Sequence, residues 1–322
     1  MASSHGRGLV HLAAALDQPS AYDARPYTEA ARLAERGGLD FLTLDDTFAH
    51  PGLDALDVLT QIASATGRIG LVPTATTPHR DPFHARAAVA TLDRVSRGRA
   101  GWWIDAPTTD HHLVAMSAAS PGSAGSGIRN AGFPGTPFSV QEPSVVPRPP
   151  HGHPVRVVDA TDGPARRTAA RYADVALVRA ASAAQAAAVR DELRSLAAEF
   201  GRGPDEPRIL AGLLVDLGGG EHAAAPGHGG GGPRQTAQGP LYRGGPVDLA
   251  ELIATWHGEG IVDGFHLTPA EPLRDLERLV NGTVALLQHR GLFRTFYPGS
   301  TLREHLGLGR PATQCAGTGR AS

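Results

Sequence analysis

The chain has few of the residues and patterns that mark several classes of protein. Cys315 is the only cysteine among 322 residues, which excludes an internal disulfide and a metal site built from cysteines. No apolar run approaches the roughly 20 residues of a membrane helix, and the N-terminal MASSHGRG lacks the apolar core of a signal peptide. A formal charge of −2 gives no reason to expect nucleic acid or an anionic membrane as a partner. We therefore expect a cytoplasmic protein.

Hydrophobic residues make up 41% of the chain, which permits a sizeable core. The 40 glycines and 26 prolines predict long irregular stretches as well. A chain of this length can form one large α/β barrel or two ordinary domains, so length alone does not decide between them.

Short apolar runs alternate with segments of helical spacing, which is typical of a parallel α/β fold. The predicted strands are 9–16, 39–44, 69–72, 99–104, 155–158, 174–178, 208–215 and 261–267. The predicted helices are 27–37, 53–65, a segment around 89–95, one that follows 159–162, 181–200, 249–257 and 273–289. In such folds ligands bind at the carboxyl ends of the strands, where the strand-to-helix loops lie.

One strand-to-helix loop is unusually rich in polar side chains. The sequence TATTPHRDPFH follows the strand at 69–72 and holds three hydroxyls, two imidazoles, an arginine and an aspartate. The strand at 39–44 ends in Asp45, Asp46 and Thr47 at the same predicted edge. Both loops are candidates for a functional site. The alternatives are a solvated polar loop and an aspartate that only caps or braces a turn.

Two stretches break the alternation. Residues 105–150 are dense in Gly, Pro and Ser and contain no convincing helix. Residues 217–240 form a low-complexity, Gly-rich segment that we expect to be a flexible loop over the site. The predicted organisation is thus one domain at 9–311, with flexible loops at about 105–150 and 217–245 and disordered ends at 1–8 and 312–322.

Two long blocks carry a family resemblance. They are IGLVPTATTPHRDPFHARAAVATLDRVSRGRAGW at 69–102 and DGFHLTPAEPLRDLERLVNGTVALLQHRGLFRTFYPGSTLREHLGLGRP at 263–311. Both resemble the bacterial luciferase-like flavin monooxygenases, in the branch of the nitrilotriacetate, dibenzothiophene-sulfone and pristinamycin-type enzymes, as does VVPRPPHGHPV at 145–155. The resemblance implies a single (β/α)8 TIM barrel that binds FMN at its C-terminal face. It also implies that a separate flavin reductase supplies reduced FMN, that O2 oxidises a small organic substrate, and that a homodimer is possible.

The resemblance also implies roles for individual residues. Asp46 and Thr47 take positions beside the flavin pocket, and Thr76 and Thr77 contact the flavin from the central loop. Thr161 lies at the turn that holds the FMN phosphate at a helix N-terminus. The candidates for catalysis are His84, His79 and Asp46, although a flavin enzyme of this kind needs little from its side chains.

Several positions depart from the pattern of that branch. Asp162 places a carboxylate at the phosphate turn, and Trp103 stands where an asparagine amide is usual. His266, a candidate for the substrate pocket, also stands where asparagine is common, and the loop after Asp105 is shortened. We therefore expect FMN binding to be weak or lost. The alternative function is a barrel without flavin that performs cofactor-independent chemistry, binds a small molecule or acts as a partner subunit.

Two further classes of site are disfavoured. His79, Asp81, His84 and 110–112 are residue types that bind zinc or iron, but their spacing matches no recognised ligand pattern, so we expect no metal. No serine lies in a Gly-x-Ser-x-Gly elbow, which disfavours an α/β-hydrolase.

Overall fold

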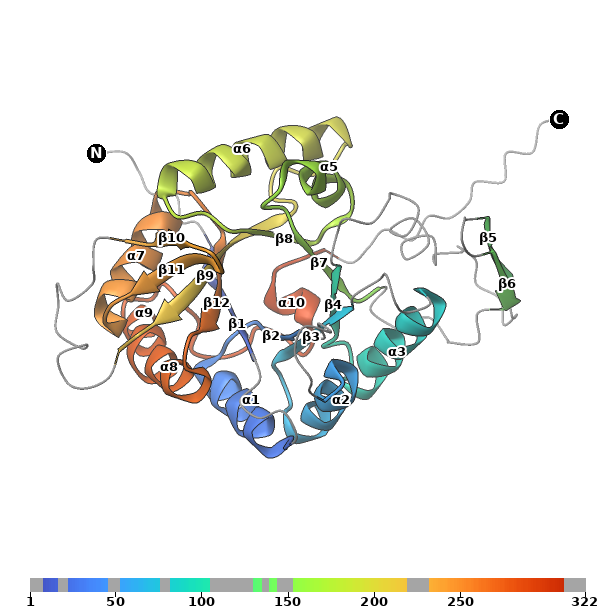
Figure 1. Cartoon of the computed structure of the whole chain (residues 1–322), viewed down its shortest axis with the longest axis horizontal. Coiled ribbons are helices and arrows are strands. Elements are labelled where there is room, and N and C mark those ends of the chain that lie inside the picture. The colour runs from blue at the N-terminus through green and yellow to red at the C-terminus, as the bar shows by residue number, and fades with distance from the viewer. Residues whose placement is uncertain are drawn as a thin grey trace.

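The computed structural model is a closed barrel of parallel strands with helices outside (Figure 1). It describes residues 8–16, 23–45, 53–75, 82–104, 130–134, 139–143, 153–218 and 232–309. Around the barrel the strands follow the order β9-β12-β1-β2-β3-β4-β7-β8, and pairing of β8 with β9 closes it. The barrel strands are β1 (His11–Ala15), β2 (Phe41–Leu44), β3 (Gly70–Ala75), β4 (Gly101–Ile104), β7 (Val155–Asp159), β8 (Val175–Val178), β9 (Arg208–Asp216) and β12 (Gly264–Pro269). The predicted (β/α)8 barrel is confirmed.

The helices follow the strands that they cover. They are α1 (Arg25–Gly37), α2 (Ala55–Ala65), α3 (Pro82–Val95), α5 (Gly163–Tyr172), α6 (Ala183–Glu199) and α7 (Pro246–Gly258). The predicted closing helix contains a π-helical turn, so that it consists of α8 (Pro272–Arg278), η2 (Leu279–Val284) and α9 (Ala285–His289). Local signals set several ends: Asp54 accepts the backbone N–H groups of Leu56 and Asp57 at the start of α2. No described helix has the length and apolar character needed to cross a membrane.

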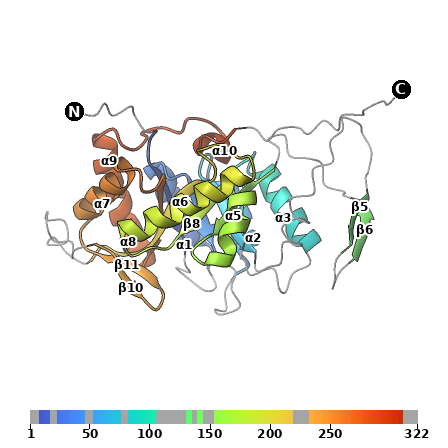
Figure 2. The same ribbon diagram turned by 90° about the horizontal axis from the view of Figure 1, so that it is seen from above.

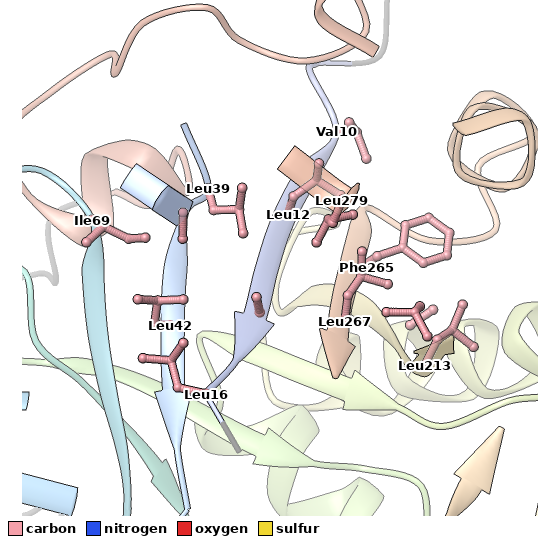
Figure 3. Packing of buried hydrophobic residues seen from close by; sticks show 14 of the residues in the cluster. Val10, Leu12, Leu16, Leu39, Leu42, Ile69, Leu213, Phe265, Leu267 and Leu279 are labelled. Atoms are coloured by element: carbon pink, nitrogen blue, oxygen red, sulfur yellow. The ribbon is translucent and has the colours of Figure 1, made fainter. Parts of the chain in front are cut away.

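The hydrophobic core has two layers, because side chains of a strand point alternately inward and outward. The larger layer lies between the strands and the helices, and Figure 3 shows part of it around Leu12, Leu42 and Phe265. The smaller layer fills the barrel interior and includes Phe41 and Val72. This layer closes the barrel below the site.

A short helix, α10 (Leu302–His305), plugs the N-terminal end of the barrel. Leu302 and Leu306 are fully buried and pack into the interior layer. Glycines at the starts of β3 and β4 make room for them, because a Cβ on Gly70 would lie 2.6 Å from Leu302 Cδ1 and one on Gly101 would lie 3.3 Å from Leu302 Cδ2. In Figure 2, α10 lies at one end of the barrel and the β10–β11 hairpin at the other.

Two buried carboxylates hold the N-terminal end together. Asp40 accepts the backbone N–H of Leu12 at 2.8 Å and forms an ion pair with Arg294 at 2.9 Å. Asp174 similarly pairs with Arg156 and Arg303, each at 3.3 Å. Burial alone would raise the pKa of Asp40, but the neighbouring His11 and Arg294 hold it below its ordinary value. Burial likewise opposes ionisation of Asp174, but Arg156 and Arg303 hold its pKa below the ordinary value, so both carboxylates are charged at neutral pH.

Short strands lie within both of the stretches that we predict to be irregular, and the flexibility of these stretches stays a prediction. Within 217–245, β10 (Arg234–Thr236) and β11 (Gly239–Arg243) form a hairpin that extends the sheet beside β9, and Tyr242 is buried. Alternate burial of Pro240 and Tyr242 anchors this hairpin despite the surrounding glycines. Within 105–150, β5 (Asn130–Pro134) and β6 (Ser139–Pro143) pair as a separate two-stranded sheet. The remaining residues of 105–150, as well as 1–7, 219–231 and 312–322, lie outside the described residues.

Candidate functional site

The C-terminal mouth of the barrel is lined by polar side chains that point inward. Thr43 ends the inward row of β2, Trp103 that of β4 and Asp159 that of β7, while Arg179 directly follows β8 and His266 lies on β12. The same alternation places Trp102 outside, where it is buried in the larger core layer. The mouth is therefore polar at its rim, whereas the interior layer below it is apolar.

His266 lies at the centre of this arrangement and is only 5% exposed. Its Nε2 and the Thr43 hydroxyl are 2.9 Å apart, so they form a hydrogen bond. The ring stacks over Phe41, with centroids 6.3 Å apart, and meets Trp103 edge to face at 5.4 Å. Burial, together with the positive charge of Arg179, lowers the pKa of His266 to about 3. The imidazole is therefore neutral at physiological pH and offers hydrogen bonds without a charge.

This buried histidine has a consequence for stability. Its pKa in the folded protein, about 3, lies below the ordinary 6.5, so the unfolded chain binds more protons between these values. The contribution of the neutral His266 to the free energy of unfolding is therefore fully present above pH 6.5, and it is lost as the pH falls towards 3. We expect His266→Gln to flatten the decline of the unfolding free energy below pH 6.5, a decline of up to about 1.4 kcal/mol per pH unit.

Urea denaturation at a series of pH values would measure this slope. Thr43→Val is the matched control, because it removes the hydrogen bond but keeps the imidazole, and it should retain the native slope. An unchanged slope in His266→Gln would show that this ring is not the group that titrates.

The turn between β7 and α5 is held by its own hydrogen bonds. Asp159 accepts the backbone N–H of Thr161 at 2.9 Å and forms an ion pair with Arg179 at 3.2 Å. The Thr161 hydroxyl in turn accepts the backbone N–H of Arg179 at 2.9 Å. The polar groups of Thr161 that could contact a ligand are thus largely engaged within the protein.

Asp162 occupies the N-cap of α5, where it is exposed and makes no capping hydrogen bond with its side chain. Pro164 in the first turn has no N–H, and the Ala165 amide donates to the Asp162 carbonyl at 3.1 Å. The nearby cations have other partners: Arg166 pairs with Glu192 at 2.5 Å and Arg167 with Glu199 at 3.5 Å. Neither arginine neutralises Asp162 in this arrangement.

The mouth of the barrel suits one part of flavin mononucleotide and not the other. The neutral imidazole of His266 and the Thr43 hydroxyl can form hydrogen bonds with an uncharged ring system, whereas the indole of Trp103 takes up part of the space. The turn at α5 does not suit a phosphate dianion, because it presents a carboxylate and few free N–H donors. The ring part of FMN fits the chemistry of the mouth, and the phosphate part does not.

The structure places four predicted site residues at the mouth: Trp103, Thr161, Asp162 and His266. Trp103 and His266 are in contact, and Thr161 is linked to them through Asp159 and Arg179, whose charge acts on His266. Five others, Asp46, Thr47, Thr76, Thr77 and His79, lie outside the described residues, as does the side chain of His84. Their roles, and those of the four placed residues, stay predictions.

Sequence reasoning missed Thr43 and Arg179. Each follows an apolar strand run, FL before Thr43 and VALV before Arg179, and each has the inward parity of its strand. Parity together with a position at a strand's carboxyl end was the signal that could have found them. Among the described residues no cluster of three or more His, Cys, Asp or Glu could hold a metal ion.

A separate groove of 1100 Å³ opens at the other end of the barrel. Its lining includes Leu9, Arg194, Asp263, Phe296 and His305. Arg194 and Asp263 are paired with each other at 3.2 Å. Because the groove lies at the N-terminal ends of the strands, it is distinct from the mouth that holds Trp103 and His266.

Comparison with known proteins identifies the family. The model of the luciferase-like monooxygenases matches residues 7–106 and 129–226, well over half of the chain. The chain belongs to this family. It is 26% identical to nitrilotriacetate monooxygenase component A of Aminobacter aminovorans over 92% of both chains. It is 27% identical to the N-acetyl-S-(2-succino)cysteine monooxygenase of Bacillus subtilis (strain 168), over 90% of this chain and 91% of that protein.

The solved structure of EDTA monooxygenase from Chelativorans sp. BNC1 has the same fold. The TM-score is 0.78 at 19% identity, covering 94% of this chain and 99% of that one. The resemblance found in the two signature blocks is thereby confirmed at the level of family and branch.

Proposed function

We propose that this protein is the oxygenase component of a two-component, reduced-flavin-dependent monooxygenase that oxidises a small organic substrate in specialised metabolism. Its similarity to a protein named nitrilotriacetate monooxygenase component A spans nearly the whole chain. The geometry that supports the proposal best is the hydrogen-bonded pair of the neutral His266 and Thr43, which lies beside the indole of Trp103 in the C-terminal mouth. A separate cytoplasmic reductase would supply the flavin, and a homodimer stays a prediction.

The side chains of the mouth would bind and orient rather than react. Reduced flavin, when bound, supplies the electrons that activate O2, which leaves the protein to position the partners and exclude water. The hydrogen bond to Thr43 fixes the orientation of His266, and its low pKa keeps it from becoming a cation during turnover. The apolar layer beneath, with Phe41 and Val72, excludes water from below. No step of proton transfer is required of these residues.

Trp103 provides a test of where the ring binds. The indole is half-buried and points into the mouth, so it reduces the room there. We expect Trp103→Asn to raise the affinity for flavin about tenfold or more, because it opens space and adds an amide that can form a buried hydrogen bond. Trp102→Phe is the control, because Trp102 points into the outer core, and it should leave flavin affinity unchanged.

Anaerobic titration with reduced flavin, followed by its absorbance, would test the proposal. We expect saturable binding, and after mixing with O2 a rate of flavin oxidation that differs from that of free reduced flavin. If neither reduced FMN nor reduced riboflavin binds, the monooxygenase proposal is wrong. The second candidate, a barrel without flavin, would then be favoured, and the internally bonded turn at Asp159, Thr161 and Arg179 is the observation that supports it.

A further inference from the structure

The turn before α5 carries an inference about which flavin this protein takes. At the positive end of a helix, a phosphate is normally held by free backbone N–H groups of the first turn and by nearby cations. In α5 the second residue is Pro164, and the Ala165 amide is used internally. Among the described hydrogen bonds, only the Gly163 amide of these three positions stays unused. The helix end thus keeps little of the donor set that a phosphate requires.

The charges at this turn also oppose a phosphate. The turn holds two carboxylates, those of Asp159 and Asp162, and the guanidinium of Arg179 pairs with Asp159. Arg166 lies close beneath the turn, since it donates to the Thr161 carbonyl at 3.0 Å, but Glu192 pairs with it at 2.5 Å. A phosphate dianion would therefore meet an uncompensated negative charge on Asp162.

The same groups suit a different chemical partner. Carboxylate oxygens accept hydrogen bonds from hydroxyl groups, and the Thr161 hydroxyl retains its own proton for donation. A chain of alcohols can therefore use Asp162 and Thr161, which a phosphate cannot do without repulsion. We propose that the flavin-type ligand of this mouth is unphosphorylated, with an uncharged polyol end at α5, so that riboflavin binds better than FMN. This inference rests on the proposed function, because it assumes that a flavin occupies the mouth.

The experiment compares the dissociation constants of riboflavin and FMN, each measured by quenching of flavin fluorescence on the native protein. We expect riboflavin to bind about tenfold more tightly at low ionic strength. Added salt should strengthen FMN binding and leave riboflavin binding unchanged, because screening weakens the repulsion. Asp162→Ser should raise FMN affinity about tenfold and should not raise that of riboflavin, because the polyol loses a carboxylate acceptor.

Asp205→Asn is the matched control. It removes one negative charge from an 80% exposed side chain at the opposite end of the barrel, and it should change neither dissociation constant. If Asp205→Asn raises FMN affinity as much as Asp162→Ser does, the local explanation is wrong. Tighter binding of FMN than of riboflavin by the native protein would overturn the inference but leave the proposed function standing. Binding of neither flavin, oxidised or reduced, would overturn both.

Discussion

Replacement of Asp40 by Ala is expected to lower the free energy of unfolding by about 3 to 5 kcal/mol, because it leaves a buried cation without its partner. Asp40 is fully buried, and Arg294, the cation it pairs with, is 8% exposed. The variant also removes the acceptor of the Leu12 N–H, a buried backbone group. Urea denaturation at neutral pH would measure the loss.

The control for this prediction is Asp23→Ala. Asp23 pairs with Arg25 at 2.9 Å and accepts the Arg25 backbone N–H at 3.0 Å, but both side chains are exposed, so the change should cost much less than the loss of Asp40. Acid provides a second check. Because the pKa of Asp40 is lowered in the folded protein, its contribution is present above the ordinary carboxyl pKa of about 4 and is lost as the pH falls below that value. A loss of under about 1 kcal/mol would show that the pair does not hold the barrel end together.

Replacement of Leu302 by Ala is expected to cost about 2 to 5 kcal/mol, the range for deleting a fully buried leucine side chain. The surrounding site cannot collapse easily, because Gly70 and Gly101 have no side chains that could move into the space. Thermal or urea unfolding would measure the change. Leu273→Ala on α8 is the control: that side chain is 44% exposed, so its loss should cost less than about 0.5 kcal/mol. Equal effects of the two variants would contradict the packing of α10 inside the barrel.

The alternation of strands and helices could be predicted because each element carries a local signal. Runs such as VALV at 175–178 are apolar on both faces, as a strand buried between helices and a barrel interior must be. The signals that end helices are equally local: Gly38 ends α1 because glycine readily adopts its left-handed φ of 80°. The positions of Trp103 and His266 at the mouth followed from strand ends alone.

Other features depend on contacts that no local pattern reveals. Thr43 and His266 are 223 positions apart and meet only because β1 lies between their strands in the closed barrel. The four-residue α10 is too short for a periodic signal, and its burial depends on Gly70 and Gly101 far away in the sequence. The β10–β11 hairpin was obscured by the glycine-rich composition around it. The pairing of Arg166 and Arg167 with α6 likewise could not be read from the charges at the α5 turn.

The helix α10 blocks the N-terminal end of the barrel beneath the apolar interior layer. Leu302 and Leu306 seal the N-terminal end from within, so the described strands leave one entrance, the mouth beside Trp103 and His266. A molecule that binds at the bottom of this mouth has to enter before any molecule that binds above it. It also has to leave after that molecule. For the two-compound reaction proposed above, a single entrance predicts an ordered entry and exit, in which an excess of the compound that binds above traps the one below and slows turnover.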